Sequence, residues 1–206
     1  MPVQTSYPGV YIEEIPSGVR TITGVSTSIT AFIGNAKKGP VDDPKTIFSF
    51  SDYERIFGGL WNLSTMSFAV RDFFQNGGGE AIIVRVTNGG TNAVAEVTDE
   101  ISLEASSAGE WGNKISFWID HATKPELDEN GDPVADEDKK LFNLFVIEEE
   151  GQRESFLNLS TDENSPNFAT NIVKERSSLV RISDLSARPD PITEENMITF
   201  EDGTNG

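Results

Sequence analysis

The sequence contains no cysteine and a single histidine, and these two shortages exclude several kinds of chemistry. Without cysteine the chain has neither disulfides nor thiolate metal ligands, which is typical of proteins that mature in a reducing compartment. It also lacks an apolar run approaching the roughly 20 residues that a membrane-spanning helix needs. No basic segment followed by an apolar one stands near the N-terminus, so we expect no secretory signal and synthesis in the cytoplasm.

Basic residues are scarce, and the deficit is concentrated in one part of the chain. The 206 residues include 34 acidic and 16 basic ones. Residues 1–90 carry 8 acidic and 7 basic side chains, whereas residues 91–206 carry 26 acidic and 9 basic ones. So acidic a surface repels phosphate backbones, which disfavours nucleic-acid binding. The contrast predicts a near-neutral unit that packs against copies of itself and an acidic unit that faces water.

The first 20 residues contain a strand-like segment without a local partner. In PGVYIEEIPSG, residues 8–18, Val10 and Ile12 point to one side of a strand and Tyr11 to the other. The flanking prolines cannot donate to a ladder and therefore bracket the pairing window. No Asn-Gly or Asp-Gly turn follows to return a partner strand. The segment must pair within its own fold or on a neighbouring molecule, and the residues alone favour an internal edge strand.

Residues 21–90 are predicted to form a small α/β unit. Strands are expected at residues 29–34, 45–50 and 81–86. The pattern Ser51-Asp-Tyr-Glu54 indicates a capping box that starts a short helix, which Gly58-Gly59 would end. A second helix is indicated by apolar residues at helical spacing. These residues are Met66, Ala69, Val70, Phe73 and Phe74.

Residues 91–200 are predicted to form an acidic, mostly β unit. Strands are expected at residues 101–105, 114–120, 141–147, 155–159 and 179–182. Ser165-Pro166 indicates the start of one helix, and residues 124–140 indicate an exposed acidic loop. From Arg188 the chain is polar and shows no terminating element, so we expect residues 201–206 to be an open end. The predicted fold class is α/β with mixed α+β character.

The motifs for catalysis or cofactor binding are incomplete. GNAKKGP, residues 34–40, has proline where a phosphate-binding loop needs lysine. Asp128 starts a pattern similar to a calcium loop, but Pro133 and Lys139 occupy the positions of the required glycine and glutamate. His121 has no G-x-S-x-G serine to activate and is interpreted as structural. We therefore predict no cofactor, no metal site, no catalytic residue and no enzymatic activity.

Seven segments in chain order carry a family resemblance. They are YPGVYIEEIPSGVRTITGVSTSITAFIG, AKKGPVDDP, SFSDYERIFGG, SFAVRDFFQNGG, EAIIVRVTN, SSAGEWGNKISFWI and NIVKERSSLVRI. Together they extend from about Pro8 to Ile182, and the chain resembles the N-terminal half of a contractile tail sheath protein. Proteins of that family occur in contractile phage tails and in phage-tail-like injection systems.

The resemblance implies a structural subunit without catalysis. Family members stack in helical rings around an inner tube and contract to drive the tube through a target envelope. The later portion of family members includes a domain folded like subtilisin and the C-terminal arm. This portion has no counterpart in the present sequence. The resemblance therefore implies a fragment of a longer protein, able to donate an arm but not to complete the mesh by itself.

The resemblance also assigns roles to the first residues. It implies that residues 1–20 are an arm that adds a strand to a neighbouring subunit. The arm strand comprises Tyr7, Pro8, Gly9, Val10, Tyr11, Ile12, Glu13, Glu14 and Ile15. Gly18 and Gly24 flank the connection to the first unit and are predicted hinges, because glycine tolerates large backbone rotations.

The implied partners are further copies in a helical homo-oligomer, the inner tube protein, and the baseplate and terminator proteins. Nucleic acid and direct membrane insertion are not implied. The implied location is the bacterial cytoplasm during synthesis and a virion tail or tail-like particle after assembly. Two alternatives stay open: another structural component of the same apparatus, or a hydrolase or sugar-binding domain whose site lies elsewhere in a longer sequence.

Overall fold

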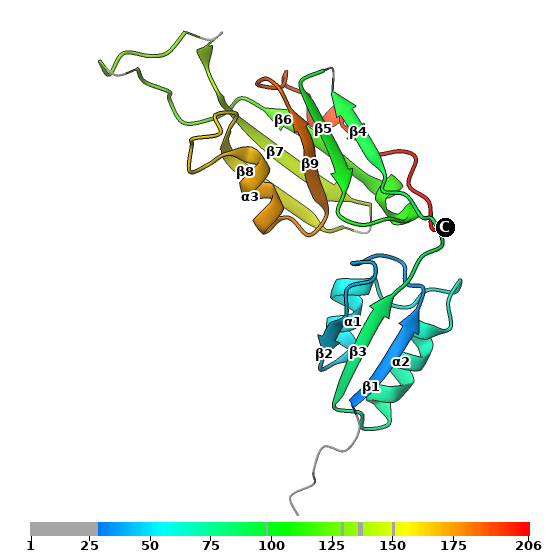
Figure 1. Cartoon of the computed structure of the whole chain (residues 1–206). Coiled ribbons are helices and arrows are strands. Elements are labelled where there is room, and N and C mark those ends of the chain that lie inside the picture. Colours follow the sequence, from blue (N-terminus) through cyan, green and yellow to red (C-terminus); the bar gives the residue numbers. More distant parts are fainter. Residues whose placement is uncertain (1–28, 98, 129, 136–137, 150) are drawn as a thin grey trace, which may run out of the picture.

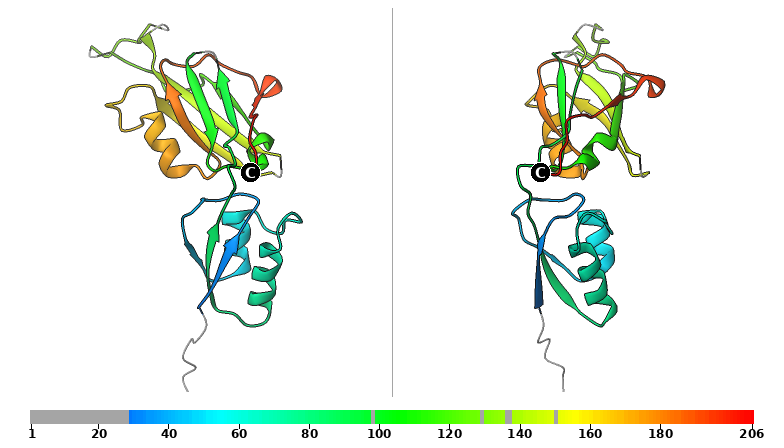
Figure 2. Two further views of the ribbon diagram at one scale, coloured as in Figure 1. Left: turned by 45° about the vertical axis from the view of Figure 1, so that its right-hand side comes forward. Right: turned by 90° about the vertical axis from the view of Figure 1, so that its right-hand side faces the viewer.

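A computed structural model describes residues 29–97, 99–128, 130–135, 138–149 and 151–206. It confirms the predicted mixture of helices and sheets. The described elements fall into a small first unit, residues 29–86, and a larger second unit, residues 91–206, each with its own hydrophobic core (Figure 1). The two units lie end to end and meet at a narrow waist (Figure 2).

The first unit is a three-stranded sheet covered by two helices. Its strands are β1 (Ile29–Gly34), β2 (Lys45–Ile47) and β3 (Glu80–Arg85), in the order β1-β3-β2. β3 runs parallel to β1 and antiparallel to β2. β3 is the central strand, as the apolar run AIIVRV at residues 81–86 predicts. However, β3 buries only alternate residues, because the helices lie on one face of the sheet.

Helix α1 (Phe50–Phe57) begins earlier than the capping box at Ser51 predicted. Its N-cap is Ser49, whose hydroxyl accepts a hydrogen bond from the Asp52 N–H at 3.1 Å. The Asp52 carboxylate accepts from the Ser49 hydroxyl at 2.9 Å and from the Phe48 N–H at 3.3 Å. The prediction of a strand to Phe50 is therefore wrong, because the Ser49–Asp52 pair satisfies the free N–H groups and starts the helix there. The predicted end is confirmed, with Gly58 in the left-handed conformation.

Helix α2 (Met66–Gln75) forms as predicted, but its buried face differs from the predicted stripe. Met66 and Val70 are buried, whereas Ala69 is exposed and Phe73 is half-buried. Ser67 is fully buried instead. Its hydroxyl accepts from the Trp61 N–H at 3.1 Å, so a polar side chain occupies the core-facing position with its hydrogen bond satisfied.

The second unit consists of two antiparallel sheets. The four-stranded sheet has the order β10-β6-β7-β8, and the three-stranded sheet has the order β4-β5-β9. The strands of the first are β6 (Ile115–Asp120), β7 (Leu141–Glu148), β8 (Arg153–Ser160) and β10 (Ile198–Thr199). Those of the second are β4 (Val94–Val97), β5 (Ile101–Ala105) and β9 (Val180–Leu185).

One core joins these two sheets. The alternation of apolar residues predicts that Leu103 of β5 and Phe117 of β6 point inward, and the structure confirms this. Phe117 and Leu144 are fully buried between the sheets. Trp118 lies on the opposite side of β6, as the same alternation predicts, and stacks on Phe145 with 5.1 Å between ring centroids. Short helical turns, η1 (Glu110–Lys114) and η3 (Glu194–Asn196), complete the unit.

The structure corrects two expectations about the second unit. Helix α3 (Ala169–Arg176) does not begin at Ser165-Pro166, because Ser165 forms a turn in which its carbonyl accepts from the Phe168 N–H. The tail from Arg188 does contain ordered elements, although its polar sequence indicated none. β10 pairs with β6, Phe200 is fully buried against Phe117, and the Thr204 N–H donates to the Thr91 carbonyl. The sequence did not predict these elements of the tail, because isolated hydrophobic residues in a polar segment give no periodic pattern.

Candidate functional site

The predicted site residues, Tyr7 to Ile15 with the hinge glycines Gly18 and Gly24, lie outside the described residues. Their roles therefore stay predictions. The structure does describe the sheet that follows them in the chain, the junction between the two units, and a groove beside that junction. These three features are the candidate assembly surfaces.

The first unit leaves one face of its sheet uncovered. The helices lie on the opposite face, as the right-hand view of Figure 2 shows. The uncovered face carries Ile29, Ala31 and Ile33 from β1, in register with Glu80, Ile82 and Val84 of β3. Ile29 is 56% exposed and Ile33 is 70% exposed. Neighbouring exposed apolar side chains are typical of interaction surfaces.

β1 also forms the longer open edge of this sheet. Only β3 pairs with it among the described residues, so its outer N–H and C=O groups have no strand partner there. Natural edge strands commonly carry charges or proline, which discourage pairing with another chain. The sequence of β1, ITAFIG, has neither. This edge is therefore suited to accept an added strand.

Arg85, the last residue of β3, ties the two units together. It is 1% exposed, and its guanidinium donates to the carbonyls of Ala36 at 3.0 Å and Gly39 at 2.6 Å in the first unit. A third bond, at 2.6 Å, reaches the carbonyl of Ala108 in the second unit. The sequence places Arg85 in an otherwise apolar strand at an inward position. An arginine at an inward position needs buried hydrogen-bond acceptors, and this feature of the sequence could have predicted the junction.

Burial changes the acid–base properties of the groups around Arg85. Removal from water lowers the pKa of Arg85 and raises the pKa of the nearby Tyr53 hydroxyl to about 12. The Tyr53 hydroxyl is buried without a hydrogen-bond partner among the described residues. It therefore stays neutral beside the guanidinium, and backbone carbonyl dipoles alone solvate the buried positive charge.

Further contacts reinforce the junction. The Lys38 ammonium lies 3.1 Å from the buried Glu148 carboxylate and 5.4 Å from the ring centre of Trp111. The Gly39 N–H donates to the Ser107 hydroxyl at 3.1 Å. Gly109 adopts a positive φ, and a Cβ there would lie 2.7 Å from the Trp111 ring, so a larger residue would push the loop apart. These interactions hold the two units in one arrangement.

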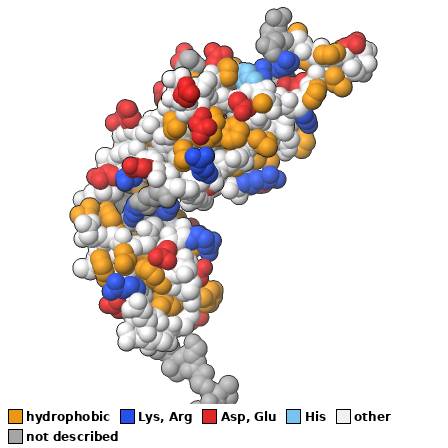
Figure 3. Space-filling view, turned by 180° about the vertical axis from the view of Figure 1, so that it is seen from behind, with side chains coloured by type: hydrophobic (Ala, Val, Ile, Leu, Met, Phe, Trp, Pro, Cys, Tyr) orange, Lys and Arg blue, Asp and Glu red, His pale blue; other side chains and the backbone are white. Residues whose placement is uncertain are grey.

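A groove of about 610 Å³ lies beside the junction and is lined by both units. The first unit contributes Lys38, Lys45 and Arg55, and the second contributes Arg181. The carboxylate that lines it is that of Asp43, which forms an ion pair with Lys45. Figure 3 shows basic side chains around the narrow region between the units. We call this feature the junction groove.

The residues considered for catalysis or metal binding have structural contacts. The His121 ring lies 2.9 Å from the Pro189 carbonyl and joins β6 to the tail. The Asp128 carboxylate accepts from the N–H groups of Asn130 and Asp132, which builds a turn. Within the described ranges, no group of three or more His, Cys, Asp or Glu side chains is arranged to hold a metal ion. No helix in the described part of the chain has the length and apolarity to cross a membrane.

The sequence matches no protein-family model and no curated protein. The fold, however, is that of solved sheath tail proteins, which confirms at the level of the fold the resemblance seen in the sequence. The sheath tail protein Lin1278 from Listeria innocua is 15% identical, with a TM-score of 0.55 over 85% of this chain. The sheath tail protein DSY3957 from Desulfitobacterium hafniense is 14% identical, with a TM-score of 0.53 over 96% of this chain. The chain spans 34% and 39% of the length of these two proteins.

Proposed function

We propose that this chain is a structural, non-catalytic subunit of a contractile tail sheath. In this role it polymerises in helical rings around an inner tube and contracts to drive the tube through a target envelope. The observation that carries the proposal is a fold shared with sheath tail proteins, combined with an unprotected edge and an apolar face on β1. In a self-assembling polymer such a surface would bind a segment of a neighbouring subunit.

In this proposal, residues Tyr7 to Ile15 of one copy are the donated strand and the β1 edge is the surface that receives it. About six backbone hydrogen bonds would form, each contributing roughly 0.5–1.5 kcal/mol net. Burial of Val10, Ile12 and Ile15 adds about 1.5–3 kcal/mol for each side chain, less the cost of ordering the arm. The free energy of one arm contact is modest, whereas many simultaneous contacts in a closed lattice hold the assembly together persistently.

The remaining roles follow from that arrangement. Gly18 and Gly24 serve as hinges that absorb rotation when subunits change their packing. The inner tube, baseplate and terminator proteins are the other partners, and the assembled location is a virion tail or a tail-like particle. The free energy that drives contraction is stored in subunit packing.

Replacing Val10 and Ile12 together with aspartate tests the proposal. Each aspartate places a charge where the added strand buries an apolar side chain, so ordered association should be lost while the subunit stays folded. Negative-stain electron microscopy at high protein concentration, sedimentation velocity and circular dichroism melting measure these outcomes. Ordered polymers formed by the double variant as readily as by the parent chain would refute arm donation.

A matched control places the same two charges outside the strand window. The Thr5→Asp and Ser6→Asp double variant should associate as the parent chain does. If both double variants lose association equally, added negative charge is the cause and the strand is not involved.

A further inference from the structure

The covalent connection between the two units bends at Asn88 and Gly89, between β3 and β4 (Figure 1). Before the bend, the Val86 N–H donates to the carbonyl of Gly34 in the first unit at 3.0 Å. After the bend, the Thr91 N–H donates to a carbonyl of the tail in the second unit at 3.1 Å. The bend is therefore a short span between two fixed points.

Asn88 and Gly89 are both exposed, and neither makes a hydrogen bond within the part of the chain that the structure describes. A Cβ built on Gly89 would meet no atom within 4 Å, so the space around this residue is open. Glycine also has no Cβ of its own to hinder a close approach. The Gly89 nitrogen is therefore free to meet the side-chain carbonyl of Asn88.

We propose that Asn88 is a site of spontaneous covalent modification by deamidation. The Gly89 nitrogen attacks the side-chain carbonyl carbon of Asn88, the carbon–nitrogen bond of the amide breaks, and ammonia leaves with the proton of the attacking nitrogen. The product is a cyclic imide. Water then opens one of its two carbonyls and gives aspartate or isoaspartate. Water is the only co-reactant, and no electrons are exchanged with another molecule.

The fold distinguishes Asn88 from the other asparagines that precede a glycine. These are Asn76, Asn130 and Asn205. The Asn76 amide donates to the Asp72 carbonyl at 2.7 Å, and the next N–H, that of Gly77, also donates within the end of α2 at 3.2 Å. The N–H that follows Asn130 donates to the Asp128 carbonyl at 3.1 Å. The Asn205 side-chain oxygen accepts from the Glu110 N–H at 3.1 Å. Each of these groups must break a hydrogen bond before it reacts, whereas Asn88 and Gly89 need not.

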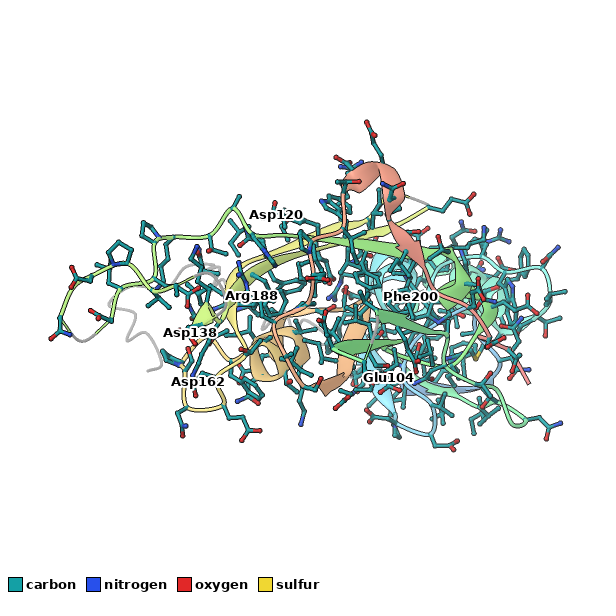
Figure 4. The ribbon with its side chains drawn as sticks, turned by 90° about the horizontal axis from the view of Figure 1, so that it is seen from above. Glu104, Asp120, Asp138, Asp162, Arg188 and Phe200 are labelled. Atoms are coloured by element: carbon teal, nitrogen blue, oxygen red, sulfur yellow. The ribbon has the colours of Figure 1, made fainter. Side chains whose placement is uncertain are left out.

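Isoaspartate would alter the connection, because its backbone runs through the former side chain and is longer by a methylene group. The next residues cannot follow such a change freely. A Cβ on Gly90 would already lie 2.8 Å from the Thr204 carbonyl oxygen, and the Thr91 hydroxyl donates to the Asp202 carbonyl at 2.7 Å. The tail itself is fixed by Phe200, which Figure 4 shows among the densely packed side chains of the second unit. The modification should therefore loosen the hydrogen bonds between Thr91 and Thr204.

This inference is independent of the proposed function, since it uses neither self-assembly nor the arm. The first test incubates the full chain in mildly alkaline buffer made with heavy-oxygen water. Peptide mapping by mass spectrometry then follows all four sites in one sample. Asn88 should take up the label about tenfold faster than Asn76, because two hydrogen bonds hold the reacting groups at Asn76. Equal or faster labelling of Asn76 or Asn130 would overturn the proposal.

The same incubation in concentrated urea is the matched control. Unfolding removes the hydrogen bonds that protect the other sites, so Asn76, Asn88 and Asn130 should then react at similar rates. If Asn88 keeps its full advantage in urea, its neighbours in the sequence select it and the structural argument fails.

A second test measures the consequence for the connection. In the aged parent chain, the amide hydrogens of Thr91 and Thr204 should exchange faster than in the fresh chain. Asn88→Gln keeps an amide but would have to close a larger ring, so its aged form should exchange as the fresh chain does. Asn76→Gln leaves the bend unchanged and should age like the parent. Unchanged exchange at Thr91 and Thr204 in an aged parent chain whose Asn88 is converted would overturn the predicted loosening.

Discussion

The two units differ in how completely they cover their apolar side chains. Among the residues that the structure describes, large exposed hydrophobic side chains number six in the smaller first unit and four in the second. Those of the first unit are Ile29, Ile33, Phe48, Leu60, Leu63 and Phe68. They lie on the open sheet face and also on the helical side, where Figure 3 shows hydrophobic side chains at the surface. In the second unit two sheets and α3 close around one core.

Charge follows the same division. Residues 1–90 are nearly neutral, and residues 91–206 hold most of the acidic side chains. A neutral, apolar surface packs against a like surface without repulsion, whereas an acidic unit keeps copies apart unless a basic surface receives it. The two units thus differ both in exposed apolar surface and in charge, and Arg85 joins them by hydrogen bonds across their junction.

The largest effect is expected from the core of the second unit. Phe117→Ala leaves a cavity between the two sheets and should lower the free energy of unfolding by about 3–5 kcal/mol. Urea denaturation measures this loss, and hydrogen exchange shows whether it is confined to the second unit. Trp118→Phe, on the opposite side of the same strand, is the control and should cost far less. Equal effects would contradict the assignment of the buried face.

The next largest effect is expected at the junction. Arg85→Met keeps the length of the side chain but leaves three buried carbonyls without their donor, which should cost about 2–3 kcal/mol. Hydrogen exchange should speed up in residues 36–39 and 106–109 together. Arg71→Met, which removes a half-buried arginine of α2, should change stability by less than about 0.5 kcal/mol. Unchanged exchange in Arg85→Met would show that the two units are not coupled through this residue.

A smaller effect is expected at the cap of α1. Ser49→Ala should destabilise the chain by about 1 kcal/mol, and Ser51→Ala should have little effect, because the cap is at Ser49.

The hydrogen bond from Ser49, and then the one from Arg55, hold the pKa of Asp52 below its ordinary value of 3.8. The carboxylate therefore stabilises the fold above that ordinary value, and this contribution is lost as pH falls through the lowered pKa. The difference between parent and Asp52→Asn in urea titrations should accordingly disappear in strong acid.

The smallest effect on stability is expected on the open face. Ile33→Lys should change the free energy of unfolding by less than about 0.5 kcal/mol, because Ile33 is 70% exposed. It should nevertheless weaken self-association in sedimentation velocity, since the charge lies on the face that we propose another segment covers. Leu157→Lys, at an exposed leucine of β8, is the matched control and should leave association unchanged. A strong loss of stability in Ile33→Lys would show that the face is already covered.

Much of the fold was predictable because the local patterns were strong. The alternating residues of β5 and β6 predict strands with one buried side, and the glycine after α1 predicts the end of that helix. The cap at Ser49 was missed because two serines compete there, and only the pairing of β2 with β3 decides where the strand ends. The order in the tail was missed because Phe200 is a single apolar residue whose partner, Phe117, is distant in the chain.

The amino-acid sequence by itself determined three properties of this protein. They are the division of charge between the two parts of the chain, the absence of thiol chemistry, and the apolar strand β1. These properties are local and additive, so they need no knowledge of neighbours. Only the tertiary structure decided that both helices cover the same face of the first sheet. Only it decided that Arg85 reaches the second unit and that scattered basic side chains converge in one groove. Such features depend on contacts between residues far apart in the chain, which no local pattern encodes.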